Sequence, residues 1–270
     1  MSLQRIVRQI DRLVNAQEKK IVNNYRDKLR KLRELIRKQY DKHEIAGQLL
    51  MSDMTKYDRI SDLDKELEKL IRELYRENST ITRLTLRQVY TDTYRNTMSY
   101  VEGETGRTIR GILKSANVTE TINERMAGIK WAERYGRHRN EAIYNIQRTV
   151  KEGLEKGDTF STMSRRLRDA MEGDVLQPTR IVRTESKRVQ AKSQKDSLDH
   201  ALKQGVEMTK TWRTSKDERV RDKHEPMEGV TIPYEDYFIL PDGTRTFAPG
   251  LSGVAEHDIH ERCFMEIEFS

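Results

Sequence analysis

The chain has 270 residues, of which 35% are charged and 35% hydrophobic, with a formal net charge of +7 and a single cysteine. One cysteine excludes an internal disulfide and a four-cysteine metal site, and no apolar run approaches the roughly 20 residues of a membrane span. The positive balance favours an acidic partner, either nucleic acid or an acidic protein surface. We expect a soluble protein made in a reducing cytoplasm.

The first 177 residues contain no proline, and their apolar residues recur every three or four positions. This spacing predicts long amphipathic helices, the first over residues 3–43. That helix would be roughly 60 Å long at 1.5 Å per residue, and its apolar stripe must pair with another helix or with a partner. Because the chain has little apolar mass, we expect this helix to lie against a larger assembly.

The opposite face of this first helix is strongly basic, and a continuous row of basic side chains can neutralise several phosphates. The same face could instead dock on an acidic protein surface. The candidate DNA- or partner-binding residues are Arg5, Arg8, Arg12, Lys19, Lys20, Arg26, Lys28, Arg30 and Lys31. No base-reading motif is visible, so any DNA contact should be independent of sequence.

Further helices follow, each bounded by capping residues, glycine or proline. We expect one helix that begins after Ser61 as N-cap, a second over 82–104, and a third from 122 to Gly157 with a break near Gly136. A short helix should follow a cap at Thr159 or Ser161, and a last one should run from Pro178 to Gly205.

The character of the sequence changes after Gly205, where alternating segments over 206–215, 229–238 and 263–269 predict strands. Asp242-Gly243 signals a hairpin turn. The fold class is therefore α+β, with a long, mostly α-helical N-terminal part followed by a small C-terminal domain that has a short antiparallel or mixed β-sheet. We expect two parts, an elongated helical region over 1–130 and a domain over 131–270 with helices to about 205 and a β region over 206–270.

Metal ligands are one candidate chemistry of the C-terminal part. The weak candidates are His224, His257, His260 and Cys263, because His257-x-x-His260-x-x-Cys263 could converge on a helix or turn. The spacing matches no strong zinc signature. We expect no cofactor, and a divalent metal stays an open alternative.

A metal-dependent nuclease is a second candidate, with Asp217, Glu218 and His224 as ligands or base, and Arg219 and Arg221 clamping phosphate. The favoured interpretation of this dense charge is local ion pairing. Neither a phosphate-binding loop nor a nucleophile elbow is present. Cys263 beside apolar neighbours is more typical of a small buried residue than of a thiol nucleophile.

Three blocks of the second half occur in the order found in a known family. They are "GLEKGDTFSTMSRRLRDAM", "RIVRTESKRVQAKSQ" and "KTWRTSKDERVRDKHEPMEGVTIPYEDYF", the last followed by "APG" and "HERCFMEIEF". Over about residues 130–270 the chain resembles the minor head proteins of tailed bacteriophages, the phage Mu F-like head morphogenesis family. Members often end this block with an Asn-Cys-Arg-Cys-like run, whereas here one cysteine is missing.

The resemblance implies a low-copy minor capsid protein of the virion, made in the host cytoplasm, located in the head near the portal and acting in head assembly or DNA delivery. Its expected partners are the portal protein, other capsid or scaffold components, and double-stranded DNA without sequence preference. We expect no enzyme activity, with the nuclease and a plain DNA-binding protein as alternatives. We interpret the family's residues as a structural network of Trp212, Asp217, Arg219, Arg221, His224, Gly229, Pro249, Gly250, Arg262 and Cys263.

Overall fold

The computed structural model describes residues 2–111 and 113–270, which form two compact units. The sheet-bearing unit comprises Met1–Gln17, Arg83–Trp131 and Ile181–Ser270, and the all-helical unit comprises Glu18–Thr82 and Ala132–Arg180. This grouping differs from the expected division at residue 130, because long helices contribute residues to both units. The α+β fold class is confirmed.

The all-helical unit is built from all or part of four long helices and two short ones, together with the first turn of α7 (Leu176–Leu202). Its elements come from α1 (Leu3–His43), α2 (Met51–Thr55), η1 (Lys56–Asp58), α3 (Arg59–Thr105), α5 (Trp131–Glu155) and α6 (Phe160–Asp174). Helix α1 has the predicted bounds. Its apolar stripe is buried within the chain itself, with at most 4% exposure at Ile21, Tyr25, Leu32, Ile36 and Tyr40. The expectation that this helix depends on a larger assembly to cover its stripe is therefore wrong.

Polar side chains tie α1, α3 and α6 together inside this unit. The hydroxyl of Tyr25 donates to Oδ2 of Asp174 at 2.6 Å, and that of Tyr75 donates to Oδ1 of the same carboxylate at 2.9 Å. Burial raises the pKa of Asp174, although both hydroxyls act to lower it. The three helices thus share one buried hydrogen-bonded centre.

Helix α3 runs unbroken where two helices were expected, and Ser61 lies inside it rather than at its N-cap. The polar run around residues 78–82 suggested an interruption. In the structure Asn78 accepts a hydrogen bond from Asn24 at 2.8 Å, and Thr82 and Tyr135 share one at 2.8 Å. Because tertiary partners engage the side-chain oxygen of Asn78 and the hydroxyl of Thr82, these two groups do not compete with the helical backbone, although Nδ2 of Asn78 is buried without a partner among the described residues.

The other helix boundaries were predicted with mixed success. Instead of one helix from 122 to Gly157, α4 (Ser115–Asn123) and α5 are separate, and α5 continues through Gly136. Thr159 caps α6 by accepting from the backbone N–H of Thr162, as predicted. Gly157, at φ +62, and Gly205, at φ +80, follow the ends of α5 and of α7 (Leu176–Leu202), where left-handed backbone suits glycine.

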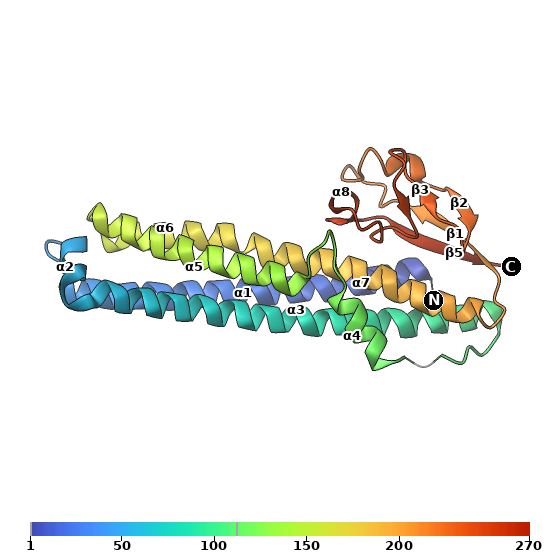
Figure 1. Cartoon of the computed structure of the whole chain (residues 1–270), viewed down its shortest axis with the longest axis horizontal. Coiled ribbons are helices and arrows are strands. Elements are labelled where there is room, and N and C mark those ends of the chain that lie inside the picture. The colour runs from blue at the N-terminus through green and yellow to red at the C-terminus, as the bar shows by residue number, and fades with distance from the viewer. Residues whose placement is uncertain (1, 112) are drawn as a thin grey trace. The chain divides into compact units, whose positions relative to one another are not determined.

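The sheet-bearing unit contains an antiparallel sheet in the order β2-β1-β5 (Figure 1). Its strands are β1 (Met208–Arg213), β2 (Thr231–Pro233) and β5 (Phe264–Phe269), which confirms the three predicted strand regions. The Asp242-Gly243 turn joins β3 (Phe238–Ile239) to β4 (Arg245–Thr246), and the short helices η2 (Glu225–Met227) and α8 (Ala255–Asp258) lie in the loops.

Side chains of the sheet and of α7 make direct contacts within this unit. The side-chain amide of Gln194 donates to the carbonyl of Met265 at 3.3 Å, and the hydroxyl of Tyr234 donates to Asp199 at 2.8 Å. The small core of the β region comprises Trp212, Met227, Phe238, Leu240 and Cys263. In the described ranges, no helix combines the length and the apolar character needed to cross a bilayer.

Candidate functional site

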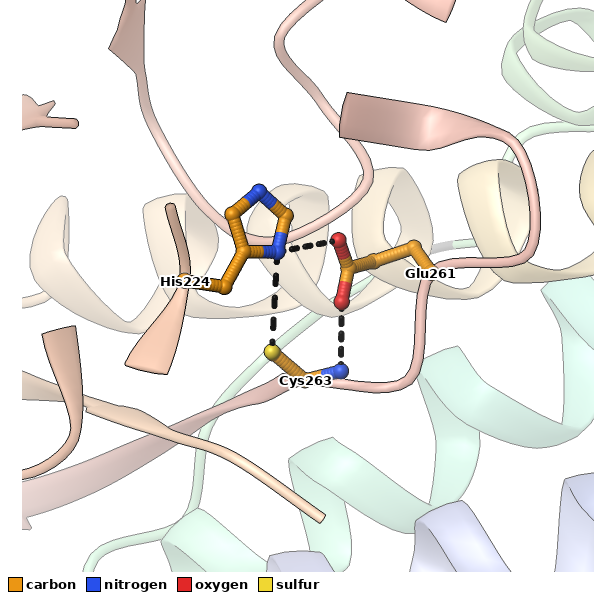
Figure 2. Close-up of side chains that lie close together, drawn as sticks. All are labelled: His224, Glu261 and Cys263. Atoms are coloured by element: carbon orange, nitrogen blue, oxygen red, sulfur yellow. Dashed lines mark hydrogen bonds and ion pairs between the residues drawn. The ribbon is translucent and has the colours of Figure 1, made fainter. Parts of the chain in front are cut away.

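His224, Glu261 and Cys263 form a buried cluster at the end of β5 (Figure 2). Nδ1 of His224 lies 2.9 Å from Oε2 of Glu261 and 3.8 Å from Sγ of Cys263. Glu261 and Cys263 come from the segment that enters β5, whereas His224 comes from the loop that follows β1. Residues far apart in sequence therefore meet in a site shielded from water.

The carboxylate of Glu261 accepts hydrogen bonds on both oxygens. Oε1 accepts the backbone N–H groups of Arg262 and Cys263, at 2.7 and 2.6 Å. Oε2 accepts from His224, and the Arg221 guanidinium lies 3.4 Å away. Burial acts to raise the pKa of Glu261, but the hydrogen bond and charge of His224 and the backbone donors lower it to about 2. Glu261 is thus a stable buried anion.

A chain of hydrogen bonds continues from His224 to the Asp242 turn. Nε2 of His224 lies 3.0 Å from Nδ1 of His257, and Nε2 of His257 lies 2.9 Å from Oδ2 of Asp242. With a carboxylate accepting at each end, the three hydrogen bonds need three N–H protons, whereas two neutral imidazoles supply two. A full set of hydrogen bonds along this chain therefore requires one proton more than two neutral imidazoles carry.

Cys263 is 1% exposed and belongs to the hydrophobic core of the β region. Burial, together with the negative charge of Glu261, raises the pKa of its thiol. A thiol held protonated is a poor nucleophile. The structure thus supports the interpretation of Cys263 as a small buried residue, and its neighbour is His224 rather than His260.

Three of these donors could hold a metal ion, because one ligand atom each from His224, Glu261 and Cys263 lies within 4.8 Å of the others. The set fits poorly, however. Both oxygens of Glu261 already accept hydrogen bonds, the Cys263 thiol is protonated, and the Arg221 guanidinium would repel a cation. His257 binds the far nitrogen of His224, and His260 does not belong to this group.

The other residues of the expected structural network surround this cluster. The Trp212 ring packs edge-on against the His224 ring, with 5.3 Å between the ring centroids. The backbone N–H of Gly229 donates to the Trp212 carbonyl at 2.9 Å. Arg221 pairs with Glu261 and bonds the Ile259 carbonyl, and Arg262 pairs with Asp217.

Three further members of that expected network have different surroundings. Pro249 and Gly250 are buried, and Gly250, at φ +84, lies against Lys187 of α7. The backbone N–H of Arg219 donates to Oδ1 of Asp217 at 3.1 Å, so Arg219 lies beside another member of the network, while its exposed side chain makes no ion pair or hydrogen bond with the described residues.

The nuclease ligand set does not assemble. Asp217 is engaged by Arg262 and by Ser215, and neither Asp217 nor Glu218 joins His224 in a metal-binding group among the described residues. The arrangement therefore offers no cluster of carboxylates of the kind that would bind Mg²⁺ for phosphodiester cleavage.

Sequence reasoning missed four residues. Glu261 and Asp242 end the hydrogen-bonded chain, and Glu228 accepts from the backbone N–H of Thr214 at 2.6 Å, which closes the loop after β1.

Lys210 is fully buried in β1, where its ammonium lies 3.2 Å from the centre of the Phe247 ring. Burial, then the charge of Lys195, lowers the pKa of Lys210 to about 7. A lysine at an inward-facing strand position was the available signal.

Eight of the nine candidate partner-binding residues of α1 are exposed: Arg5, Arg8, Arg12, Lys19, Lys20, Arg26, Arg30 and Lys31. Lys28 is the exception, since it is 3% exposed and its ammonium lies 3.3 Å from Oε2 of Glu73. The ammonium of Lys28 is thus buried and paired inside the chain, whereas the side chains of the other eight are exposed.

Comparison with known proteins gives matches to the C-terminal half and to nearly the whole chain. Residues 144–266 match the family described as Phage Mu protein F like protein. Minor head protein GP7 of Bacillus phage SPP1 is 27% identical over 258 residues, which cover 94% of this chain and 82% of that protein. NAD(+)–arginine ADP-ribosyltransferase EFV of Enterococcus faecalis is 25% identical over 146 residues, 54% of this chain but 30% of that protein. No solved structure matches significantly.

Residues 144–266 match the phage Mu protein F-like family, which confirms the resemblance seen in the sequence. Its near full-length similarity to a minor head protein extends this relationship into the N-terminal helices. Together the two matches support a minor head protein of the phage Mu F-like kind.

Proposed function

We propose that the protein is a low-copy component of the phage head that binds the portal and neighbouring head proteins, and contacts packaged DNA, during head assembly or DNA delivery. The observation that carries this proposal is the similarity to a minor head protein over 94% of the chain. A structural role also suits the buried cluster, whose charged groups are occupied by one another. The similarity to the transferase covers 30% of that enzyme and carries no activity to this chain.

The exposed basic face of α1 supports contact with DNA. Its side chains at Arg5, Arg8 and Arg12 are exposed and form no ion pair with the described residues. Binding through such groups releases counterions from the phosphate backbone, which makes the affinity fall steeply with salt. We expect binding to duplex DNA without sequence preference.

A groove in the all-helical unit supports contact with another head protein. The groove has a volume of about 540 Å³, and four arginines of α1 outnumber its one carboxylate, Glu34. The arginines are Arg26, Arg30, Arg33 and Arg37, and the apolar lining is Leu29 and Phe160. The Arg37 guanidinium stacks 3.6 Å from the centre of the Phe160 ring. An apolar floor edged by arginines is complementary to an acidic amphipathic helix, which we propose as the docking segment of the portal or a neighbouring head protein.

Co-purification with the portal protein of the same phage tests the protein contact. We expect the intact chain to co-elute with portal, and Arg30→Glu with Arg37→Glu to abolish co-elution. Arg165→Glu with Lys203→Glu, at exposed positions outside the groove, is the matched control. Equal recovery of portal with both double variants would exclude the groove as the docking surface.

Titration of duplex DNA at several salt concentrations tests the second contact. The triple variant Arg5→Gln, Arg8→Gln and Arg12→Gln should reduce the slope of log affinity against log salt by up to about three. Changing Lys65, Lys69 and Arg72 to Gln removes the same charge from α3 and should leave the slope nearly unchanged. A wild-type affinity without salt dependence would contradict DNA binding through phosphates.

A further inference from the structure

An open pocket of about 690 Å³ lies in the sheet-bearing unit next to the buried cluster, with which it shares Glu261. Its lining includes five cationic side chains and two carboxylates, Asp11 and Glu261. The cations are Arg183, Lys187, Arg219, Arg221 and Arg262. They come from "RIVRTESK" in α7, from "DERVR" in the loop after β1, and from "HERC" before β5. Folding therefore gathers positive charge from three separate stretches of sequence.

Two of these cations are not held by an ion pair or a side-chain hydrogen bond in the described chain, although the charge of Arg219 also acts on Asp217. Arg221 is paired with Glu261, and Arg262 with Asp217. The ammonium of Lys187 and the guanidinium of Arg219 form no ion pair or hydrogen bond with the residues that the structure describes. Bringing like charges together is unfavourable in a partly desolvated site, and a bound anion offsets that repulsion.

The hydroxyl of Ser186 is a second and independent sign of a ligand. Ser186 lines the same pocket and is 1% exposed. Its Oγ is buried without a hydrogen-bond partner in the described ranges. Buried hydroxyls in native proteins nearly always have a partner, so one left unsatisfied in a cationic pocket points to an absent acceptor.

We propose that this pocket binds a phosphoryl group, whose oxygens are contacted by Lys187, Arg219 and Ser186. A phosphoryl group offers several acceptor oxygens and up to two negative charges, which suits an arginine fork, an ammonium and a hydroxyl. The volume lies within the roughly 300–1,000 Å³ of small-molecule sites and exceeds what phosphate alone requires. The phosphoryl group is therefore carried on a larger ligand, either a phosphorylated small molecule or the backbone of DNA.

The charges that oppose an anion are few. The Glu261 carboxylate is neutralised by its contacts with His224 and Arg221. Asp11 lies on an exposed position of α1. The unpaired cations thus outnumber the unpaired carboxylates in the lining.

Calorimetric titration of the full chain with inorganic pyrophosphate, and separately with a 20-base-pair duplex, tests the proposal. Lys187→Gln and Arg219→Gln should each weaken binding about tenfold, since each removes a charge-assisted hydrogen bond. Lys203→Gln removes an exposed charge just beyond α7 and should change affinity less than twofold. Melting curves without ligand check that the variants are folded.

Ser186→Ala separates ligand binding from a structural role. We expect it to weaken pyrophosphate or duplex binding about fivefold while the melting temperature of the free protein stays the same or rises, because an unsatisfied hydroxyl has been removed. A role in the fold alone would lower the melting temperature and leave the affinity per folded molecule unchanged.

The two probes distinguish the source of the phosphoryl group. Pyrophosphate binding that the pocket variants weaken assigns the pocket to a small phosphorylated ligand. Binding of the duplex alone, with a salt slope reduced by about one in each charge variant, assigns it to the DNA backbone. If the pocket variants and Lys203→Gln behave alike toward both probes, the proposal is wrong.

Discussion

Oε2 of Glu261 lies 2.9 Å from Nδ1 of His224, and each side chain is 1% exposed. This buried pair joins the segment before β5 to the loop after β1, and a single carboxylate also holds Arg221 and two backbone N–H groups. Removing one member of such a pair leaves its partners buried without compensation. The stability of the β region should therefore depend on this one side chain.

Glu261→Gln should lower the free energy of unfolding by about 3 kcal/mol at pH 7, since His224 and Arg221 lose their charged partner. Glu268→Gln, at an exposed position of β5, should cost less than about 0.5 kcal/mol. Denaturant unfolding of both variants measures this. Equal losses would show that the pair contributes no more than a surface residue.

The same carboxyl group predicts the acid response. Its pKa is about 2 in the folded protein against an ordinary 4.5, so its stabilisation is present above pH 4.5 and is lost as the pH falls toward 2. The loss amounts to about 3 kcal/mol. Unfolding curves between pH 5 and 2 should show a stability difference between the wild type and Glu261→Gln that narrows with acid. A difference in stability that stays constant over this pH range would contradict a lowered pKa of Glu261 in the folded protein.

Arg221→Ala should destabilise the protein more than Asp217→Ala. Arg221 pairs with a carboxylate of 1% exposure, whereas Asp217 and Arg262 are 35% and 41% exposed. Loss of Arg221 should cost about 2 kcal/mol, because a buried acceptor is left undersatisfied, and loss of Asp217 should produce a small change. Thermal melts of the two variants decide the order, and the reverse order would refute this account of the network.

Lys210 should make the stability of the protein depend on pH above 7, whereas Glu261 acts at acid pH. Its folded pKa of about 7, against an ordinary 10.5, means that folding releases a proton between these values. Stability therefore rises with pH above 7, by up to about 1.4 kcal/mol per unit. Lys210→Met should lack this rise. Between pH 7 and 8.5 the free energy of unfolding of the wild type should therefore increase by about 2 kcal/mol relative to that of the variant. Parallel pH profiles would show that the amine stays charged.

A chelator should leave the fold intact. The His224, Glu261 and Cys263 atoms are satisfied by one another and by Arg221, so no ion is needed to hold them together. Treatment with EDTA or a stronger zinc chelator should leave the melting temperature unchanged within about 1 °C, with elemental analysis showing no stoichiometric metal. A fall of several degrees that zinc reverses would establish a metal centre at these three residues.

The sequence predicted the elements better than the contacts between them. The absence of proline and the apolar spacing located the first helix at its observed bounds, and Thr159 was recognisable as a cap because capping is local. The interruption expected in α3 near Asn78 failed because its polar side chains find partners in other helices. The burial of the α1 stripe could not be predicted for the same reason, since it depends on which helices pack together.

In the candidate site, too, the sequence indicated individual residues better than the contacts between them. His224 and Cys263 were candidate site residues from the sequence, but Glu261 was not singled out. Its importance arises from His224, 37 positions away. Arg219 and Arg221 looked equivalent, yet one pairs with a buried carboxylate and the other lines an open pocket. Charge patterns indicate that pairing occurs without specifying the partners.

Electron cryo-microscopy of the intact particle, resolved at the portal vertex without imposed symmetry, tests the role of the protein most directly. The account predicts density for this chain in a few copies per head in contact with the portal, with the arginine-lined groove of α1 covered by an acidic segment. Purified heads that contain no copy of the chain, by both imaging and mass spectrometry, would contradict it.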